Sequence, residues 1–186
     1  MRRAAAAGDE WLSPLGIPFR TPSLATAPNV VFVSQWDNFP DHIEIPLNGK
    51  ARRACLLMAG STYWMQSRRQ NGHIAVQYTD GTRSVLKLEN PTNWWPIDQD
   101  YFIDNGAFAR PDPVPPRLDL KTAQLRISEP RDFSKRSATI AGGAATILDL
   151  ELDPTKTLRN LHLEADANDV VIGILSLSLQ RAHPPK

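Results

Sequence analysis

Five aromatic residues flank a predicted β-hairpin in an arrangement that suits the binding of a sugar. They are Tyr63, Trp64, Trp94, Trp95 and Tyr101. Sugars present apolar C–H faces that stack on aromatic rings, while their hydroxyl groups require polar partners. Polar residues suited to that second role stand nearby in the chain: Gln66, Arg68, Asn93, Asp98 and Asp100. Together these residues form the candidate ligand-binding set.

The alternative for each tryptophan is a place in the hydrophobic core. Adjacent residues of a strand point to opposite faces, so we expect one of Trp94 and Trp95 to be core and the other to lie nearer the surface. Trp64 stands in a polar, turn-rich segment, GSTYWMQSRRQN (60–71), which predicts a long loop. Trp64 is therefore the residue expected to present its ring to solvent.

Acidic side chains offer two further kinds of chemistry. Asp98, Asp100 and Asp104 form a sparse run of oxygen ligands of the kind that Ca²⁺ takes. The run lacks the glycine and the closing glutamate of a calcium loop, which favours a solvated acidic loop. Asp37 or Glu44 could pair with Asp98 as the two carboxylates of a glycoside hydrolase, but the sequence gives no carboxylate separation. Enzymatic activity is the weakest of the functional hypotheses.

The histidines show no pattern that is typical of a metal site. His42, His73, His162 and His183 lack spacings such as H-x₃-H, and the first three occupy polar alternates of predicted strands. A solvated imidazole is the ordinary outcome there. The pair Gly142-Gly143 belongs to no phosphate-binding motif, and no serine lies in a G-x-S-x-G turn. We therefore expect no cofactor, no bound metal and no catalytic residue.

Composition sets the class of protein. The chain has 186 residues, a 41% hydrophobic fraction and 16 prolines, which suit one core with long connections. Lys and Arg (21) nearly balance Asp and Glu (20), so no charge pattern indicates nucleic acid or an anionic membrane as partner. No apolar run reaches the roughly 18 residues of a membrane helix, and the start is too short for a signal-peptide core. Cys55, in the apolar run ACLLMAG, is expected to be a packed thiol.

The elements that must position these residues are short strands. In HIAVQYTDGTRSVLKL (73–88), β-prone residues alternate with polar ones on both sides of Asp80-Gly81, which predicts a hairpin with a tight primed turn. The apolar segment 53–59 (RACLLMA) predicts a strand covered on both faces. The remaining predicted strands are residues 29–33, 42–46, 147–152, 158–163 and 170–179.

The connections complete the predicted organisation. Residues 1–28 are expected to be an irregular lead-in, although the apolar residues within 15–19 could attach it to the core. A proline-rich crossover is predicted at 103–117, and a tail at 183–186. Residues 29–182 then form a single all-β domain, an antiparallel β-sandwich whose long crossover suits a jelly-roll connection.

Several motifs resemble a known group of modules. These are IPLNGKA before an apolar strand, Y-x-DGT in a hairpin, N-x-WW after it and LDLELDPTK near the end. They resemble the accessory β-sandwich modules of large bacterial glycoside hydrolases and related polysaccharide-degrading proteins. The similarity covers roughly residues 15–182. It implies a galactose-binding-domain-like jelly-roll in a periplasmic or secreted parent protein, and it transfers no catalytic residue.

The sequence therefore predicts a non-catalytic accessory module of a carbohydrate-processing protein. In one version it binds an oligo- or polysaccharide through surface aromatic residues. In the other it is a structural brace that packs against a catalytic or partner domain and has no ligand of its own. An exposed aromatic platform beside a polar groove would favour binding, whereas a broad apolar patch would favour the brace.

Overall fold

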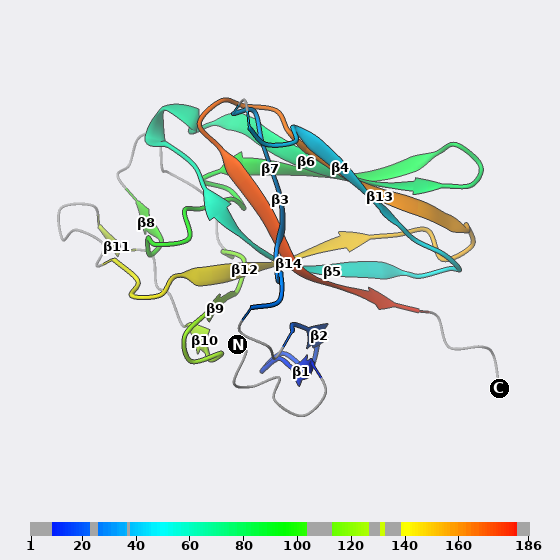
Figure 1. The fold of residues 1–186 in the computed structure, drawn as a ribbon, viewed down its shortest axis with the longest axis horizontal. Helices are drawn as coiled ribbons and strands as arrows, with labels where there is room; N and C mark the ends of the chain where they lie inside the picture. Colours follow the sequence, from blue (N-terminus) through cyan, green and yellow to red (C-terminus); the bar gives the residue numbers. More distant parts are fainter. Residues whose placement is uncertain are drawn as a thin grey trace.

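The computed structural model contains two antiparallel β-sheets that pack face to face (Figure 1). It describes residues 9–22, 26–36, 38–103, 113–126, 131–132 and 139–181. The larger sheet contains β3 (Val31–Ser34), β5 (Arg53–Ser61), β9 (Arg117–Asp119), β10 (Leu125–Arg126), β12 (Ala144–Glu151) and β14 (Val171–Gln180). The smaller sheet contains β4 (His42–Pro46), β6 (Arg69–Tyr78), β7 (Arg83–Asn90) and β13 (Leu158–Ala165).

The strand orders are β10-β9-β12-β5-β14-β3 in the six-stranded sheet and β4-β13-β6-β7 in the four-stranded sheet. This arrangement confirms the all-β sandwich. Two small pairs lie outside these sheets. The hairpin of β1 (Glu10–Leu12) and β2 (Pro18–Arg20) is antiparallel, and β8 (Phe102–Ile103) pairs with β11 (Arg131–Asp132) in parallel. Among the described residues the helical content is one 3₁₀ turn, η1 (Trp64–Gln66), and no helix is long and apolar enough to span a membrane.

Strand β5 lies at the centre of the larger sheet and is buried on both faces. Leu56 and Met58 point into the core between the two sheets, whereas Cys55 and Leu57 pack in a second apolar cluster on the opposite face. Such double burial is what a continuous apolar run requires. The prediction for this strand is confirmed, and the structure extends it to Ser61.

The second apolar cluster explains the order of the N-terminal segment. Trp11 and Phe19 are paired across the β1–β2 hairpin, with ring centroids 6.2 Å apart, and both are buried against the outer side of the larger sheet. The prediction of an irregular lead-in is therefore wrong for residues 10–20. The expectation that apolar residues attach this segment to the core is confirmed by Phe19, which is fully buried.

The predicted hairpin is present as β6 and β7, but its turn is longer than the two-residue primed type. The Tyr78 amide donates to Thr82 O, and Gly81 adopts a φ of +84°. Asp80 is not among the described residues with positive φ, so only the glycine takes the left-handed conformation. Glycine at the last position of the loop permits this positive φ. The Asp80 side chain stabilises the loop by accepting from the Thr82 amide.

Strand β13 lies between β4 and β6, and this placement matters most for the site. The register places His162 between Glu44 and Ala75, and Glu164 between His42 and His73. Alternate residues such as Leu161 and Leu163 are fully buried in the core between the sheets. The polar residues of three neighbouring strands are thereby brought to the opposite, outer face.

Candidate functional site

The aromatic residues after the hairpin form part of the interior. Trp94, Trp95 and Tyr101 are each 1% exposed. The prediction that one tryptophan lies nearer the surface is therefore wrong. Trp94 belongs to the core between the sheets, while Trp95 and Tyr101 meet edge to face with ring centroids 5.2 Å apart. Neither tryptophan ring nor the Tyr101 ring is available to a ligand in this arrangement.

A buried arginine holds this aromatic corner in place. The Arg117 guanidinium is stacked 5.3 Å from the Tyr101 ring centroid and donates to the carbonyls of Pro96, Gln99 and Ala144. Burial lowers the pKa of Arg117 from its ordinary value. No local pattern indicates that Arg117, the last residue of the predicted proline-rich crossover, enters this corner.

Acidic residues of the same segment have structural roles. Asp100 is buried, and both of its carboxylate oxygens accept from Nη2 of Arg126, at 2.9 and 3.0 Å. Asp98 is exposed, and its carbonyl accepts from the amide of Ile140. Asp104 and Asp37 lie outside the described residues. Because Asp100 is engaged by Arg126 and two of the other named carboxylates lie outside the described residues, the calcium and glycosidase hypotheses stay predictions.

The loop before the hairpin is shorter than predicted and only partly exposed. Tyr63 is 48% exposed and Arg68 is exposed, whereas Gln66 is buried. Asn71 stabilises the loop, because its side-chain amide donates to the carbonyls of Gln66 and Arg69. The backbone of Trp64 is in η1, and its side chain is not described.

Asn93, at the other end of the hairpin, stabilises the backbone there. Its side-chain oxygen accepts from Glu89 N, and its side-chain amide donates to Lys87 O.

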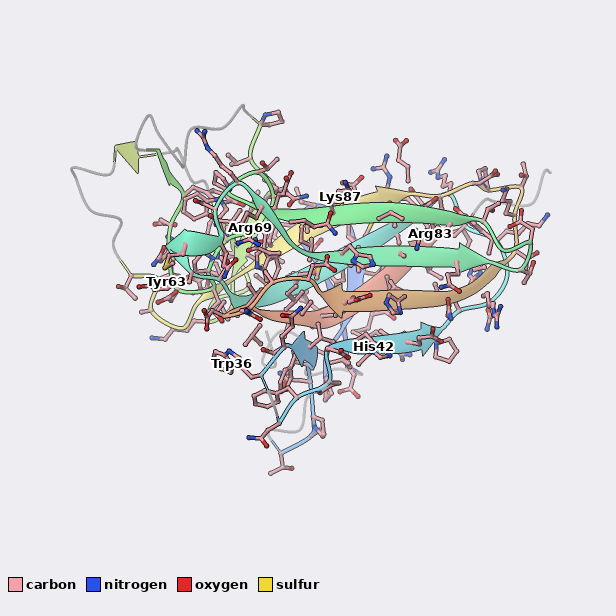
Figure 2. All side chains as sticks on the ribbon, turned by 90° about the horizontal axis from the view of Figure 1, so that it is seen from above. Trp36, His42, Tyr63, Arg69, Arg83 and Lys87 are labelled. Carbon is pink, nitrogen blue, oxygen red and sulfur yellow. The ribbon has the colours of Figure 1, made fainter. Side chains whose placement is uncertain are left out.

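The outer face of the four-stranded sheet gathers the polar residues that the sequence left unassigned. Figure 2 looks onto this face, with His42 beside one edge and Arg83 and Lys87 along the strands of the opposite edge. The outer face is formed by His42 and Glu44 of β4, His162 and Glu164 of β13, His73 and Gln77 of β6, and Arg83, Val85 and Lys87 of β7.

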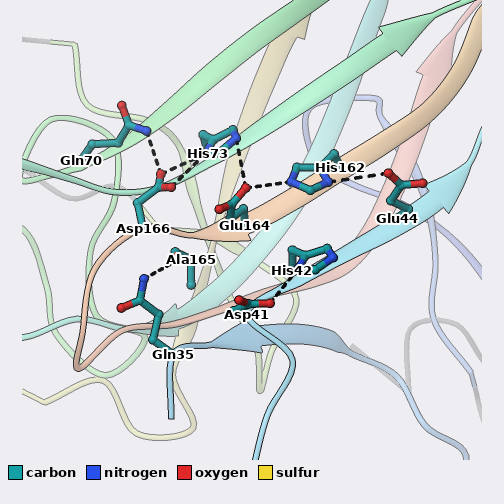
Figure 3. A network of polar contacts seen from close by, with 10 residues as sticks. All are labelled: Gln35, Asp41, His42, Glu44, Gln70, His73, His162, Glu164, Ala165 and Asp166. Carbon is teal, nitrogen blue, oxygen red and sulfur yellow. Dashed lines mark hydrogen bonds and ion pairs between the residues drawn. The ribbon is translucent and has the colours of Figure 1, made fainter. Parts of the chain in front are cut away.

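A connected network crosses the middle of this face (Figure 3). Glu164 Oε2 lies 2.9 Å from His162 Nε2 and 3.8 Å from His73 Nε2. His73 Nδ1 lies 2.9 Å from Asp166 Oδ2, which also accepts from Gln70 Nε2 at 2.7 Å. On the other side, His162 Nδ1 is 3.9 Å from Glu44 Oε1. Two imidazoles therefore share one carboxylate at the centre, and each has another carboxylate near its far nitrogen.

His42 lies beside this network. Its ring stacks on that of His162 with centroids 5.5 Å apart, and its Nδ1 is 2.6 Å from Asp41 Oδ1. This hydrogen bond lowers the pKa of Asp41, although Asp41 is fully exposed. His42 thus enlarges the polar surface while its Nδ1 is already engaged.

Trp36 lies outside the strands of the smaller sheet, on the side of its edge strand β4 (Figure 2), and forms an exposed aromatic pair with Phe39. Trp36 is 49% exposed and Phe39 is 40% exposed, with ring centroids 6.4 Å apart. Phe39 also meets Phe32 edge to face at 5.1 Å, which fixes its position. Trp36 and Phe39 belong to the segment between β3 and β4, which passes from the larger sheet to the smaller one, whereas Phe32 lies in β3 itself.

Comparison of the chain with models of known protein families, with curated proteins and with solved structures gave no match. The arrangement of side chains is therefore the basis for a functional hypothesis.

The sequence contained a signal for the network that spacing rules do not detect. Both His42-x-Glu44 and His162-x-Glu164 place two ionisable residues on one face of a strand. Metal-binding motifs are usually recognised by the spacing of ligands within one short segment. Here His73 and His162 lie 89 residues apart in the sequence, on two strands that pair. Only the pairing of β13 with β6 brings them together.

Proposed function

We propose that this protein is a non-catalytic accessory module of a carbohydrate-processing protein and binds glycan on the outer face of its smaller sheet. The observation that supports this proposal is the exposed Trp36–Phe39 pair on the β4 side of a polar face. The setting in a carbohydrate-processing protein and the jelly-roll, galactose-binding-like topology are both part of the proposal.

Trp36 is held close to polar groups by the backbone. The Gln35 side chain donates to Ala165 O at 2.9 Å, and the Ala165 amide donates to Asp41 O at 2.9 Å. The aromatic segment is thereby joined to the end of β13, directly before Asp166. A sugar stacked on Trp36 would find carboxylate and imidazole partners for its hydroxyl groups along this end.

The opposite edge of the same face is basic. Arg83 and Lys87 of the edge strand β7 lie on this face and are both exposed (Figure 2). Arg69, at the start of β6, is exposed as well. Cationic side chains on an edge strand also discourage pairing with another sheet. Their position supports the inclusion of acidic polysaccharides among the ligands to be tested.

The experiment is native gel electrophoresis through a panel of soluble neutral and acidic polysaccharides. Retardation of the wild-type chain by at least one of them is expected. Replacing Trp36 by Ala removes stacking worth on the order of 1–2 kcal/mol, which corresponds to about tenfold weaker retardation. Leu12→Ala is the control, because Leu12 is also an exposed apolar residue but lies on β1, whose hairpin packs on the outer side of the larger sheet.

The structural brace is the alternative outcome. A wild-type chain that migrates unchanged through every polysaccharide, or a Trp36→Ala variant that is retarded as strongly as the wild type, would contradict binding through this residue. Exposed Val30 and Val31, which lie at the edge strand β3, would then be the first place to seek a contact with a partner domain.

A further inference from the structure

We infer that His73, His162 and Glu164 bind a divalent transition-metal ion of the Zn²⁺ class at the centre of the outer face. This inference does not depend on glycan binding. The three side chains each offer one ligand atom, and these atoms all lie within 4.8 Å of one another. The group is formed by β6 and β13, which pair directly, so its ligands project from rigid elements.

The separations suit a single ion. Ligand atoms about 2.1 Å from a tetrahedral Zn²⁺ lie roughly 3.4 Å from one another. In the structure, Glu164 Oε2 is 2.9 Å from one imidazole Nε2 and 3.8 Å from the other. One of these distances is shorter and the other longer than the ligand-to-ligand separation in a tetrahedral site, so small side-chain rotations would accommodate an ion.

His73 already has the tautomer that a metal requires. A carboxylate accepts hydrogen bonds and does not donate them, so the contact between His73 Nδ1 and Asp166 Oδ2 at 2.9 Å requires a proton on Nδ1. In the neutral ring, Nε2 then carries a lone pair that is directed toward Glu164. A lone pair and a carboxylate oxygen facing each other at 3.8 Å gain from a cation between them.

His162 has the complementary arrangement on its other side. Its Nδ1 is buried and has no hydrogen-bond partner among the described residues, yet Glu44 Oε1 lies 3.9 Å away. When Nε2 of His162 coordinates an ion, the ring proton moves to Nδ1 and faces this carboxylate. Glu44 is itself held by the side-chain amide of Asn160 at 2.9 Å. Metal-binding histidines commonly direct their second nitrogen to a carboxylate in this way.

The donor set selects the class of ion. Two imidazoles and one carboxylate suit Zn²⁺ and its neighbours Co²⁺ and Ni²⁺, whereas Ca²⁺ and Mg²⁺ prefer oxygen donors throughout. The imidazoles are mostly covered, with 17% and 18% of their side chains exposed, while Glu164 is 42% exposed. Three protein ligands leave a further position open to water or to an oxygen of a bound molecule.

The test uses tag-free protein and two probes, Co²⁺ followed by its visible absorption bands and Zn²⁺ followed by titration calorimetry. One equivalent of each ion is expected to bind the wild-type chain. His73→Ala, His162→Ala and Glu164→Gln each remove one of three ligands and are expected to weaken binding at least 100-fold. The intensity of the Co²⁺ bands also reports the coordination number, which is low if one water completes a tetrahedral site of three protein ligands.

His42→Ala is the matched control. His42 lies on the same face and stacks on His162, but it is not among the three converging ligands. This variant is expected to retain one equivalent of Co²⁺ with affinity within about threefold of wild type. Circular dichroism and thermal melts in the presence of a chelator show whether each variant is folded. Absence of stoichiometric binding by folded wild type, or unchanged binding by folded His73→Ala and Glu164→Gln, would overturn the inference.

Discussion

His73 and Asp166 are 93 residues apart in the sequence, yet Nδ1 of the imidazole lies 2.9 Å from Oδ2 of the carboxylate. The Gln70 side chain donates to the same oxygen at 2.7 Å, so Asp166 is restrained as well. A partly exposed pair of this kind contributes at most about 1 kcal/mol to folding. Its main effect is to fix the tautomer and the direction of the His73 ring.

Replacement of Asp166 by Ala should therefore change metal affinity more than stability. The substitution leaves all three proposed ligands in place but removes the acceptor that holds the Nδ1 proton of His73. Loss of such a partner lowers metal affinity by about 10–100-fold. Calorimetric titration with Zn²⁺ measures this change, and chemical unfolding in the presence of a chelator should show a loss of about 1 kcal/mol or less.

Asn168→Ala provides the control for that measurement. Asn168 is exposed in the same connection between β13 and β14 and has no described contact with the network. Its removal should leave Zn²⁺ affinity unchanged. Equal affinities of the Asp166→Ala and wild-type proteins would show that the carboxylate does not orient a metal-binding imidazole.

Trp95 and Trp36 should respond to truncation in opposite ways. Trp95 is buried and its Nε1 donates to Pro91 O at 2.7 Å, so Trp95→Ala leaves a cavity and an unpaired carbonyl. We expect a loss of roughly 3–5 kcal/mol in the free energy of unfolding. Trp36 is half exposed, and Trp36→Ala should cost less than about 1 kcal/mol. Urea unfolding measures both, and similar losses would contradict this assignment of core and surface.

Much of the fold could be predicted because strand alternation is a local property. The β4 boundaries agree with the predicted residues 42–46, and β12, β13 and β14 agree to within three residues at each end. The hairpin predicted over 73–88 is longer, since β6 begins at Arg69 and β7 ends at Asn90. The β1–β2 hairpin was not predicted because its strands are three residues long and its prolines suggested irregular structure. This hairpin is held in a regular structure because Trp11 and Phe19 pack on β5, which is a tertiary contact.

The candidate site could not be predicted in the same way. Aromatic residues mark both cores and sugar platforms, and the burial of Trp95 and Tyr101 depends on Arg117 arriving from another segment. The histidine–carboxylate network depends on β13 pairing with β4 and β6 at once. That pairing joins segments that are distant in the chain, and no local pattern specifies it.

Cys55 should react slowly with thiol reagents in the folded protein. It is 8% exposed, and burial, with a smaller effect of Asp149, raises the pKa of its thiol, so little thiolate is present near neutral pH. The rate should increase steeply with pH and with unfolding by guanidinium. Because Cys55 is the only cysteine in the chain, a thiol-colour assay reports on it alone. A native rate near neutral pH that equals the unfolded rate would show that this face of β5 is open.

The loop between β6 and β7 should give the protein an acid-sensitive contribution to stability. The Asp80 carboxylate accepts hydrogen bonds from both the hydroxyl and the amide of Thr82, and Lys156 Nζ lies 3.0 Å away. Hydrogen bonding from Thr82, with a smaller effect of Lys156, lowers the pKa of Asp80 from 3.8 to about 2. The charged form is therefore favoured by folding.

The sign of the pH dependence follows from this lowered pKa. Stabilisation by Asp80 is fully present above the unfolded pKa of 3.8 and is lost as the pH falls toward the folded value of about 2. The difference in free energy of unfolding between wild type and Asp80→Ala should therefore be constant near neutral pH and shrink steadily below about pH 4. Asp80→Asn, which keeps an acceptor for the Thr82 amide, should retain part of the stability without this pH dependence. Urea unfolding at a series of pH values measures all three proteins, and a difference that stays constant down to pH 3 would contradict the lowered pKa.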